Sequence, residues 1–282
     1  MATIIPMAGL GSRFARDGYV LPKPLVPVSG KPMILRVIED LPKDDKWVFM
    51  VRKEHVDDYA IDKVLRSALP DAIIVPVEKT TEGQACTCML AAPYLEPGEP
   101  LLIAACDNGY LYDTVAMAGL MADSSVDAIL WTFTKKETLR RNPRAWGWVV
   151  PGEDGRTVKD VSVKVPVSDN PYNDHAVVAT FWFRRAGDFM AAVDAMIKAD
   201  HRINNEFYVD AVPKFLNTMH KRTVFFDIDL YLGWGTPKDL YDHQRMEFLA
   251  FYGDSAPLSA PLSAEETRDL GKYRQYFAAK GL

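Results

Sequence analysis

The sequence predicts an α/β fold in which a mostly parallel, Rossmann-like β-sheet is covered by helices on both faces. Along the first half of the chain, short apolar runs alternate with amphipathic segments, a pattern typical of parallel strands joined by helices. The 282 residues suffice for one large domain with a full apolar core. A composition of 48% hydrophobic and 25% charged residues is that of an ordinary globular protein.

The elements of the first half follow from hydrophobic spacing. Apolar runs of strand length alternate with segments in which apolar residues recur every three or four positions. The predicted strands are residues 3–6, 46–51, 72–77, 101–105 and 127–133, and the predicted helices are residues 32–41, 54–69 and 84–92.

The pattern changes after about residue 140. Residues 146–150, 158–165 and 177–184 are typical of antiparallel strands, so we expect a β-rich insertion over about 140–185. Helices return at 186–199 and 205–219, a strand follows at 223–228, and Thr236 with Pro237 begins another helix. A Pro/Ser linker at 255–263 precedes a last helix from about 265. We therefore predict one domain over 1–250, followed by a linker and C-terminal helix over 251–282.

Composition excludes several classes of function. A net charge of -5 argues against duplex nucleic acid as a partner, since such binding needs a basic face. No apolar run approaches the ~20 residues of a membrane span, and the N-terminal residues lack the features of a secretory signal. Three cysteines without a second metal-ligand cluster favour buried thiols in a reducing compartment. We expect a cytoplasmic protein with no membrane and no nucleic-acid partner.

A glycine turn follows the first predicted strand. Gly9 and Gly11 lack side chains, so backbone N–H groups there can approach a phosphate. Arg13 and Lys23 add fixed positive charge, and together with this loop they form an expected polyphosphate cradle. The nucleotide-binding residues of the loop are Ala8, Gly9, Leu10, Gly11 and Ser12, and Arg13 and Lys23 are the residues expected to be catalytic.

Two commoner phosphate-binding motifs fail on spacing. A dinucleotide-binding fingerprint needs a third small residue where Phe14 stands. A P-loop ending at Lys31 needs Gly and Ser/Thr where Leu25 and Pro32 stand.

The combination of Gly-x-Gly-x-Arg, Pro-Lys-Pro around Lys23 and then Lys31-Pro32 resembles the nucleotide-sugar pyrophosphorylases, a family of NTP transferases that act on sugar phosphates. The resemblance extends to about residue 250. It implies a fold of the nucleotide-diphospho-sugar transferase type. It also implies transfer of a nucleoside monophosphate from a nucleoside triphosphate to a phosphorylated small molecule, with Mg²⁺ as cofactor and pyrophosphate as product. A sugar 1-phosphate is the expected acceptor.

The same resemblance assigns further site residues. It places Glu78 and Gly83 at the nucleotide base, and Gly147, Lys164 and Glu206 at the acceptor. It makes Asp107 a metal ligand, and a carboxylate at the end of a parallel strand is also where open α/β sheets bind ligands.

The second metal ligand departs from the family pattern. Many relatives carry an Asp two residues before a Gly-Thr pair, but this chain has Gly233 there. Asp227 and Asp229 alternate along a predicted strand and either could replace it, with Asp229 nearer the loop. The alternative is that Asp107 holds Mg²⁺ together with phosphate oxygens and water.

Other functions stay open at this point. The opening segment also resembles a branch found in capsule-polysaccharide gene sets, in which some members are thought to be cytidylyltransferases acting on non-sugar phosphates. A glycosyltransferase would need Asp-x-Asp where Asp107-Asn108-Gly109 stands, and Gly233 would suit a regulator without catalysis. The last helix is open to two roles: packing on the domain, or subunit contacts in a homo-oligomer.

Overall fold

The computed structural model describes residues 1–253 and 261–282, so most of the predicted linker lies outside the described residues. Contacts between residues divide the chain into two compact units. Unit 1 comprises residues 1–10, 42–106 and 114–227, and unit 2 comprises residues 11–41, 107–113 and 228–282. This division runs through the predicted domain 1–250 rather than along its end.

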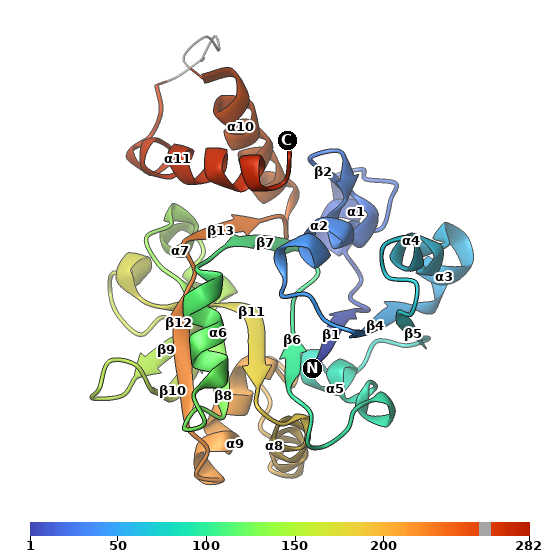
Figure 1. Cartoon of the computed structure of the whole chain (residues 1–282), viewed down its shortest axis with the longest axis vertical. Coiled ribbons are helices and arrows are strands. Elements are labelled where there is room, and N and C mark those ends of the chain that lie inside the picture. Colours follow the sequence, from blue (N-terminus) through green and yellow to red (C-terminus); the bar gives the residue numbers. More distant parts are fainter. Residues whose placement is uncertain (254–260) are drawn as a thin grey trace. The chain divides into compact units, whose positions relative to one another are not determined.

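Unit 1 is built on a nine-stranded sheet (Figure 1). A path of seven strands has the order β10-β9-β11-β6-β1-β4-β5, and β8 joins β11 to β12. β1 pairs in parallel with β4 and β6, β4 with β5, and β8 with β12, which confirms the predicted mostly parallel α/β sheet. The strands are β1 (Ala2–Met7), β4 (Lys46–Arg52), β5 (Ile73–Val77), β6 (Leu101–Ile103), β8 (Ala128–Phe133), β9 (Gly147–Pro151), β10 (Val158–Val163), β11 (Ala176–Phe183) and β12 (Thr223–Asp227).

One strand of the predicted insertion lies in the middle of this sheet. β11 runs antiparallel between β6 and β8, and at its start it also meets β9. Every residue of β11 except Ala179 is buried, and its pairing with β8 shifts register between Val177 and Phe181. Residues 140–185 therefore contribute a central strand as well as the peripheral pair of β9 and β10.

The helices of unit 1 differ from the prediction in several respects. Ala60 adopts a left-handed φ of 49°, which divides the predicted helix 54–69 into two. Asn204 and Asn205 also have positive φ, 51° and 64°, and form a tight turn, so the predicted helix 205–219 starts only at Val212. The α-helices are α3 (Lys53–Tyr59), α4 (Ile61–Ala68), α5 (Gln84–Met89), α6 (Thr114–Ala122), α7 (Glu137–Arg141), α8 (Ala186–Lys198) and α9 (Val212–Thr218), and the short 3₁₀ turns are η2 (Ala92–Tyr94), η3 (Pro143–Ala145), η4 (Pro171–Asn173) and η5 (Val209–Ala211). Two of these helices, α6 and α7, were not predicted.

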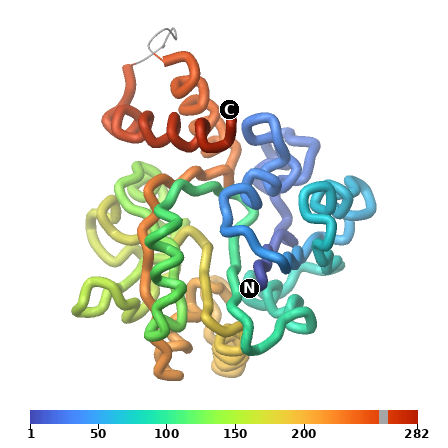
Figure 2. The backbone as a smooth tube through the Cα atoms, in the orientation of Figure 1, coloured from blue at the N-terminus to red at the C-terminus, as the bar shows by residue number. Residues whose placement is uncertain are grey.

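Unit 2 joins short strands to two long helices. Its antiparallel ribbon of β7 (Asn108–Leu111) and β13 (Leu230–Gly233) was not predicted. The predicted start of α10 (Pro237–Tyr252) is confirmed, since the Asp239 N–H donates to Thr236 Oγ1 at 3.1 Å. α11 (Ala264–Ala279) packs beside α10 (Figure 2). The other elements are α1 (Ser12–Arg16), η1 (Lys23–Leu25), β2 (Pro27–Val28), β3 (Lys31–Pro32) and α2 (Met33–Asp40).

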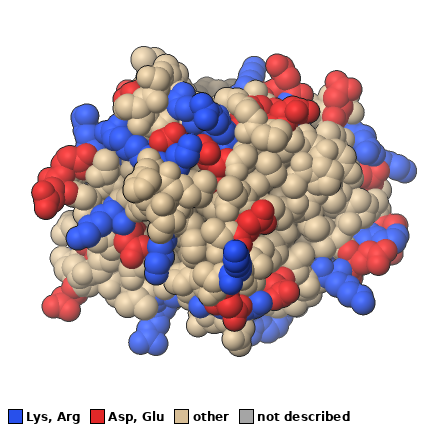
Figure 3. Space-filling model, turned by 90° about the horizontal axis from the view of Figure 1, so that it is seen from below, with Lys and Arg blue, Asp and Glu red and all other residues tan. Residues whose placement is uncertain are grey.

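The surface carries both signs of charge. On the face that Figure 3 shows, Lys and Arg side chains are interspersed with Asp and Glu.

Among residues 1–253 and 261–282, no helix is long and apolar enough to cross a membrane.

Candidate functional site

The part of the glycine turn that belongs to unit 2 begins at Gly11. Gly11 adopts a left-handed φ of 61° and precedes α1, which begins at Ser12. A Cβ at Gly11 would be in ordinary contact with the Cβ of Lys23, at 3.4 Å, so the left-handed conformation is the reason for glycine here. The Arg13 side chain is exposed, and within the described part of the chain no hydrogen bond or ion pair engages it. Its guanidinium is thus available to an anionic ligand.

Lys23 and Asp107 form an ion pair. Lys23 Nζ donates to Asp107 Oδ2 at 2.7 Å, and the two side chains are 21% and 26% exposed. The Trp234 N–H donates to the Asp107 carbonyl at 2.9 Å, and a Cβ at Gly235 would lie 3.0 Å from Asp107 Oδ2. The backbone therefore fixes a carboxylate and an ammonium group that solvent can reach.

The register of the β7–β13 ribbon corrects the assignment of Asp229. Leu230 pairs with Leu111 and Gly233 with Asn108, so Asp107 lies opposite Trp234 at one end of the ribbon. Asp229 lies just beyond the other end, roughly 17 Å along the strand at ~3.4 Å per residue. Asp229 is therefore not placed to share a metal ion with Asp107.

Asp227 is engaged elsewhere, in unit 1. Its Oδ1 accepts hydrogen bonds from Thr132 Oγ1 at 2.7 Å and from His175 Nδ1 at 2.8 Å. It ends β12, whereas β13 begins only at Leu230, so Asp227 and Asp229 do not share a strand as the sequence suggested.

The residues near Asp107 fit a magnesium ion only in part. No cluster of three His, Cys, Asp or Glu side chains suited to a metal occurs within residues 1–253 and 261–282. Asp107 offers one carboxylate, and Mg²⁺ is commonly held by one or two carboxylates plus substrate phosphates. This donor set suits a magnesium ion that arrives with a nucleotide rather than a resident metal.

The sequence analysis assigned no role to Asn108, although it named the Asp107-Asn108 pair. The side chain is buried, and its Nδ2 is without a hydrogen-bond partner among the described residues. A buried amide donor without a partner costs free energy, which makes Asn108 a further candidate for ligand contact.

The residues of the predicted phosphate cradle that belong to unit 1 follow β1. Ala8 is buried, Leu10 is exposed, and a Cβ built at Gly9 would meet no atom within 4 Å. The fold without a ligand thus does not require glycine at position 9. We favour the close approach of a ligand as the reason for glycine there.

Gly83 has a structural reason to be glycine. Its φ is 135°, and a Cβ would lie 2.5 Å from the backbone N and O of Phe207. The Phe207 N–H donates to the Glu82 carbonyl at 2.9 Å, and the Ala85 N–H donates to the Phe207 carbonyl at 3.0 Å. The predicted base-binding loop is therefore joined to the segment that carries Glu206. Glu78, just after β5, is exposed.

Gly147 and Lys164 converge on one buried carboxylate, that of Asp210. A Cβ at Gly147 would lie 2.6 Å from Asp210 Oδ2. Burial raises the pKa of Asp210 to about 6, while the positive charge of Lys164 opposes that shift. Lys164 itself has a φ of 66°, donates to the Ala145 carbonyl at 2.6 Å and lies 5.2 Å from the centre of the Tyr208 ring.

Glu206 reaches this group through Tyr208. Burial, followed by the charge and hydrogen bond of the Glu206 carboxylate, raises the pKa of Tyr208. The structure thus brings together Gly147, Lys164 and Glu206, all three predicted acceptor residues, and adds Asp210 and Tyr208. Asp210 closes the Glu-Phe-Tyr-Val-Asp run that sequence reasoning singled out, so a signal for it was present.

Comparison with known proteins identifies the family. A sequence profile of the MobA-like NTP transferase domain matches residues 3–151, more than half of the chain. The chain belongs to this NTP transferase family. This confirms the resemblance to the NTP transferases.

Individual relatives of this NTP transferase are distant. The bifunctional protein GlmU of Thermotoga petrophila is 25% identical over 219 residues, which cover 75% of this chain and 44% of that protein. The chain thus spans less than half the length of the curated relatives that it matches.

Solved structures confirm the fold. A nucleoside-diphosphate-sugar pyrophosphorylase from Vibrio cholerae RC9 superposes with a TM-score of 0.68 at 19% identity, covering 86% of this chain and 99% of that chain. The inositol-1-phosphate CTP transferase of T. maritima has a TM-score of 0.65 at 16% identity, covering 86% and 95%.

Proposed function

We propose that this NTP transferase moves a nucleoside monophosphate from a nucleoside triphosphate to a phosphate oxygen of a small acceptor and releases pyrophosphate. A sugar 1-phosphate is the acceptor that we propose. The observation that carries the proposal is the Lys23–Asp107 ion pair beside the left-handed Gly11, with the exposed Arg13 two residues further on. Two cations and one carboxylate, together with a glycine turn, suit a magnesium-bound polyphosphate.

The reaction needs charge stabilisation more than proton transfer. An acceptor phosphate oxygen attacks the α-phosphorus, and the bond from that phosphorus to the bridging oxygen of pyrophosphate breaks. Since the second pKa of a phosphomonoester is about 6, the attacking oxygen is already ionised near neutral pH. A general base is therefore not required, and positioning with charge neutralisation carries the catalysis.

Arg13 and Lys23 then have defined tasks. We assign Arg13 and the backbone of residues 9–12 to the β- and γ-phosphates, where they stabilise the departing pyrophosphate. Lys23 would leave its partner oxygen on Asp107 for the oxygens of the α-phosphate. Mg²⁺ bound to Asp107 and the phosphates would offset the repulsion between two anionic reactants.

Unit 1 supplies the groups that we assign to the base and to the acceptor. Gly83 and Glu78 are the proposed contacts of the base. Lys164 offers a cation for the acceptor phosphate, and Asp210 and Glu206 offer carboxylates that accept hydrogen bonds from hydroxyl groups. That mixture of one cation and two carboxylates suits a phosphorylated polyol such as a sugar phosphate.

A cytidylyltransferase acting on a non-sugar phosphate is the second candidate. The fold shared with the inositol-1-phosphate CTP transferase favours it, because that protein joins a nucleotide to a phosphorylated polyol that is not a sugar. Membership of the capsule-polysaccharide branch stays a prediction of the sequence.

Pyrophosphate release tests the proposal. Each of the four nucleoside triphosphates would be incubated with Mg²⁺ and a panel of sugar 1-phosphates, inositol 1-phosphate and phosphocholine, with mass spectrometry of the product. We expect release that requires both a nucleotide and an acceptor. Nucleotide binding by calorimetry without release for any acceptor would instead indicate a regulator, and formation of a nucleoside diphosphate from a nucleotide sugar would indicate a glycosyltransferase.

A further inference from the structure

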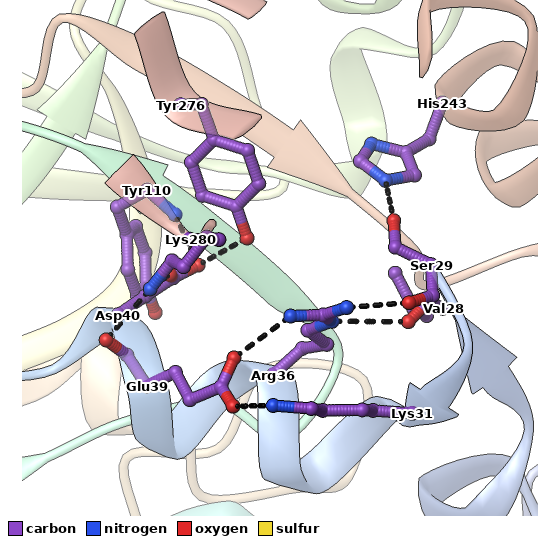
Figure 4. Close-up of polar contacts among 10 residues, drawn as sticks. All are labelled: Val28, Ser29, Lys31, Arg36, Glu39, Asp40, Tyr110, His243, Tyr276 and Lys280. Carbon is purple, nitrogen blue, oxygen red and sulfur yellow. Dashed lines mark hydrogen bonds and ion pairs between the residues drawn. The ribbon is translucent and has the colours of Figure 1, made fainter. Parts of the chain in front are cut away.

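The end of α11 is attached to one buried carboxylate, that of Asp40. The Tyr276 hydroxyl donates to Asp40 Oδ2 at 3.0 Å, and the Lys280 ammonium pairs with Asp40 Oδ1 (Figure 4). Lys280 Nζ also donates to the Glu39 carbonyl at 2.7 Å. The helix is thus held where α2 ends, by a charge with almost no access to solvent.

The same carboxylate holds β7. The Tyr110 N–H donates to Asp40 Oδ2 at 3.1 Å. The close approach of Asp40 also requires glycine at position 109. A Cβ at Gly109 would overlap Asp40 Oδ2 and lie 2.6 Å from Cη2 of Trp234. β7 begins at the residue after Asp107, so three peptide units separate the Tyr110 residue that Asp40 holds from Asp107.

A second set of contacts leads from α2 toward Lys23. Arg36 Nε donates to the Val28 carbonyl at 3.2 Å, its guanidinium also donates to the Ser29 carbonyl, and Arg36 pairs with Glu39 at 2.9 Å. These contacts tie α2 to the β2–β3 turn, and η1, which begins with Lys23, lies just before β2 and packs on α2. One helix therefore supports the segments that carry both members of the ion pair.

We infer that Asp40, Tyr276 and Lys280 form a positioning group that sets the distance between Lys23 and Asp107, so that α11 takes part in catalysis without touching substrate. This inference rests on the proposed function. It also gives the last helix a role on the domain itself.

The electrostatics around Asp40 make the group sensitive to pH. Burial raises the pKa of Asp40 to about 6, and the positive charge of Lys280 opposes that rise. The groups that face Asp40 are Tyr276 of α11, Lys280 just after α11, Tyr110 of β7 and Tyr112 just after β7. Glu39 and Arg36 of α2 add their charges at Tyr276. Loss of Lys280 would raise the pKa of Asp40 further, so the carboxylate would become protonated and release its partners at a higher pH.

Lys280→Met tests the inference by kinetics, because it keeps the length of the side chain and removes its charge. We expect kcat to fall about tenfold at pH 7 while the KM for nucleotide changes by less than about twofold, since misplaced catalytic groups act on the transition state. The ratio of variant to wild-type kcat should recover toward pH 9, and this ratio cancels the ionisation of the acceptor. The matched control is Arg274→Met on the same helix. Within residues 1–253 and 261–282, the Arg274 side chain donates its one hydrogen bond to the Ala250 carbonyl, so this variant should leave kcat unchanged.

Hydrogen exchange supplies a readout that does not depend on turnover. In Lys280→Met and in the milder Tyr276→Phe, amide exchange in a peptide spanning residues 107–112 should accelerate, while a peptide from α10 should be unaffected. If the wild type turns over and both variants keep wild-type kcat and exchange, the inference is wrong. If the wild type turns over no acceptor, the proposed function fails, and the exchange data still decide whether α11 holds β7.

Discussion

Unit 1 and unit 2 bury different kinds of polar residue. The core of unit 1 is a large apolar cluster on its nine-stranded sheet, and most of the buried polar residues of its described part are threonines. Unit 2 is smaller, and in its described part it buries four ionisable side chains with 6% or less of their surface exposed. They are Arg36, Asp40, His243 and Asp269.

This difference indicates how each unit stays folded. Both units bury many apolar side chains, and this burial stabilises each of them. Unit 2 adds buried charged hydrogen bonds with fixed directions, which contribute less net stability but specify one arrangement. Unit 2 also carries Arg13, Lys23 and Asp107, so the residues that we assign to the triphosphate belong to the part of the chain built on directional charge contacts.

The largest expected effect lies in unit 2, at Lys23. Lys23→Ala should lower kcat by roughly 10²–10³, the cost of deleting one preorganised charge contact at a developing negative charge. Steady-state kinetics with the best substrate pair from the pyrophosphate assay would measure it.

A second lysine of unit 2 provides the control. Lys238 pairs with Asp242 on the exposed face of α10, and such pairs stabilise by only ~0.5 kcal/mol, so Lys238→Ala should keep wild-type kcat. If Lys23→Ala retained kcat within about twofold, Lys23 would not be a catalytic cation. The buried charge contacts of unit 2 could then not be linked to catalysis through Lys23.

Local signals in the sequence predicted most of unit 1 and the start of α10. Apolar runs marked β1 and β4, and Thr236 with Pro237 marked the helix cap. The helix predicted over 205–219 was wrong at its start, because two asparagines adopt positive φ in a turn that hydrophobic spacing does not register.

Pairing between distant segments could not be predicted in this way. β7 and β13 have four residues each and are separated by more than a hundred positions, so neither gives a periodic signal. Their register determines that Asp229 lies far from Asp107. Likewise, the sequence marked Gly83 as a base contact but could not show that the backbone of Phe207 requires glycine there.

Among its described residues, unit 1 has two exceptions to the buried threonines, His55 and Asp210. Asp210 is a buried carboxylate at the proposed acceptor site. Its pKa rises from the ordinary aspartate value of 3.8 to about 6, chiefly by burial, so the folded state binds its proton more tightly than the unfolded state. Its contribution to stability is therefore present below about pH 4 and is lost as the pH rises through about 6.

Asp210→Asn, which mimics the protonated acid, tests that assignment. The free energy of unfolding of the variant relative to wild type should increase from pH 4 to pH 8 by up to about 3 kcal/mol, as measured by urea denaturation. A difference that stayed flat over this range would mean that Asp210 ionises as an ordinary carboxylate. Asp210 would then resemble the buried threonines of unit 1 in contributing no pH dependence to stability.

A smaller effect is expected at Gly147. A substitution there distinguishes a role in the geometry of the acceptor site from a role in the stability of unit 1. A Cβ at Gly147 would lie 2.6 Å from Asp210 Oδ2 and 3.0 Å from its Cγ, so Gly147→Ala must displace the carboxylate. We expect the KM for the acceptor to rise about tenfold, a loss of ~1.4 kcal/mol of binding, with the KM for nucleotide unchanged. Gly98→Ala is the matched control, because a Cβ there meets nothing within 4 Å and its φ is not left-handed. Should both variants raise the two KM values equally, the Gly147–Asp210 contact would serve only the packing of unit 1, and the acceptor would have to bind elsewhere.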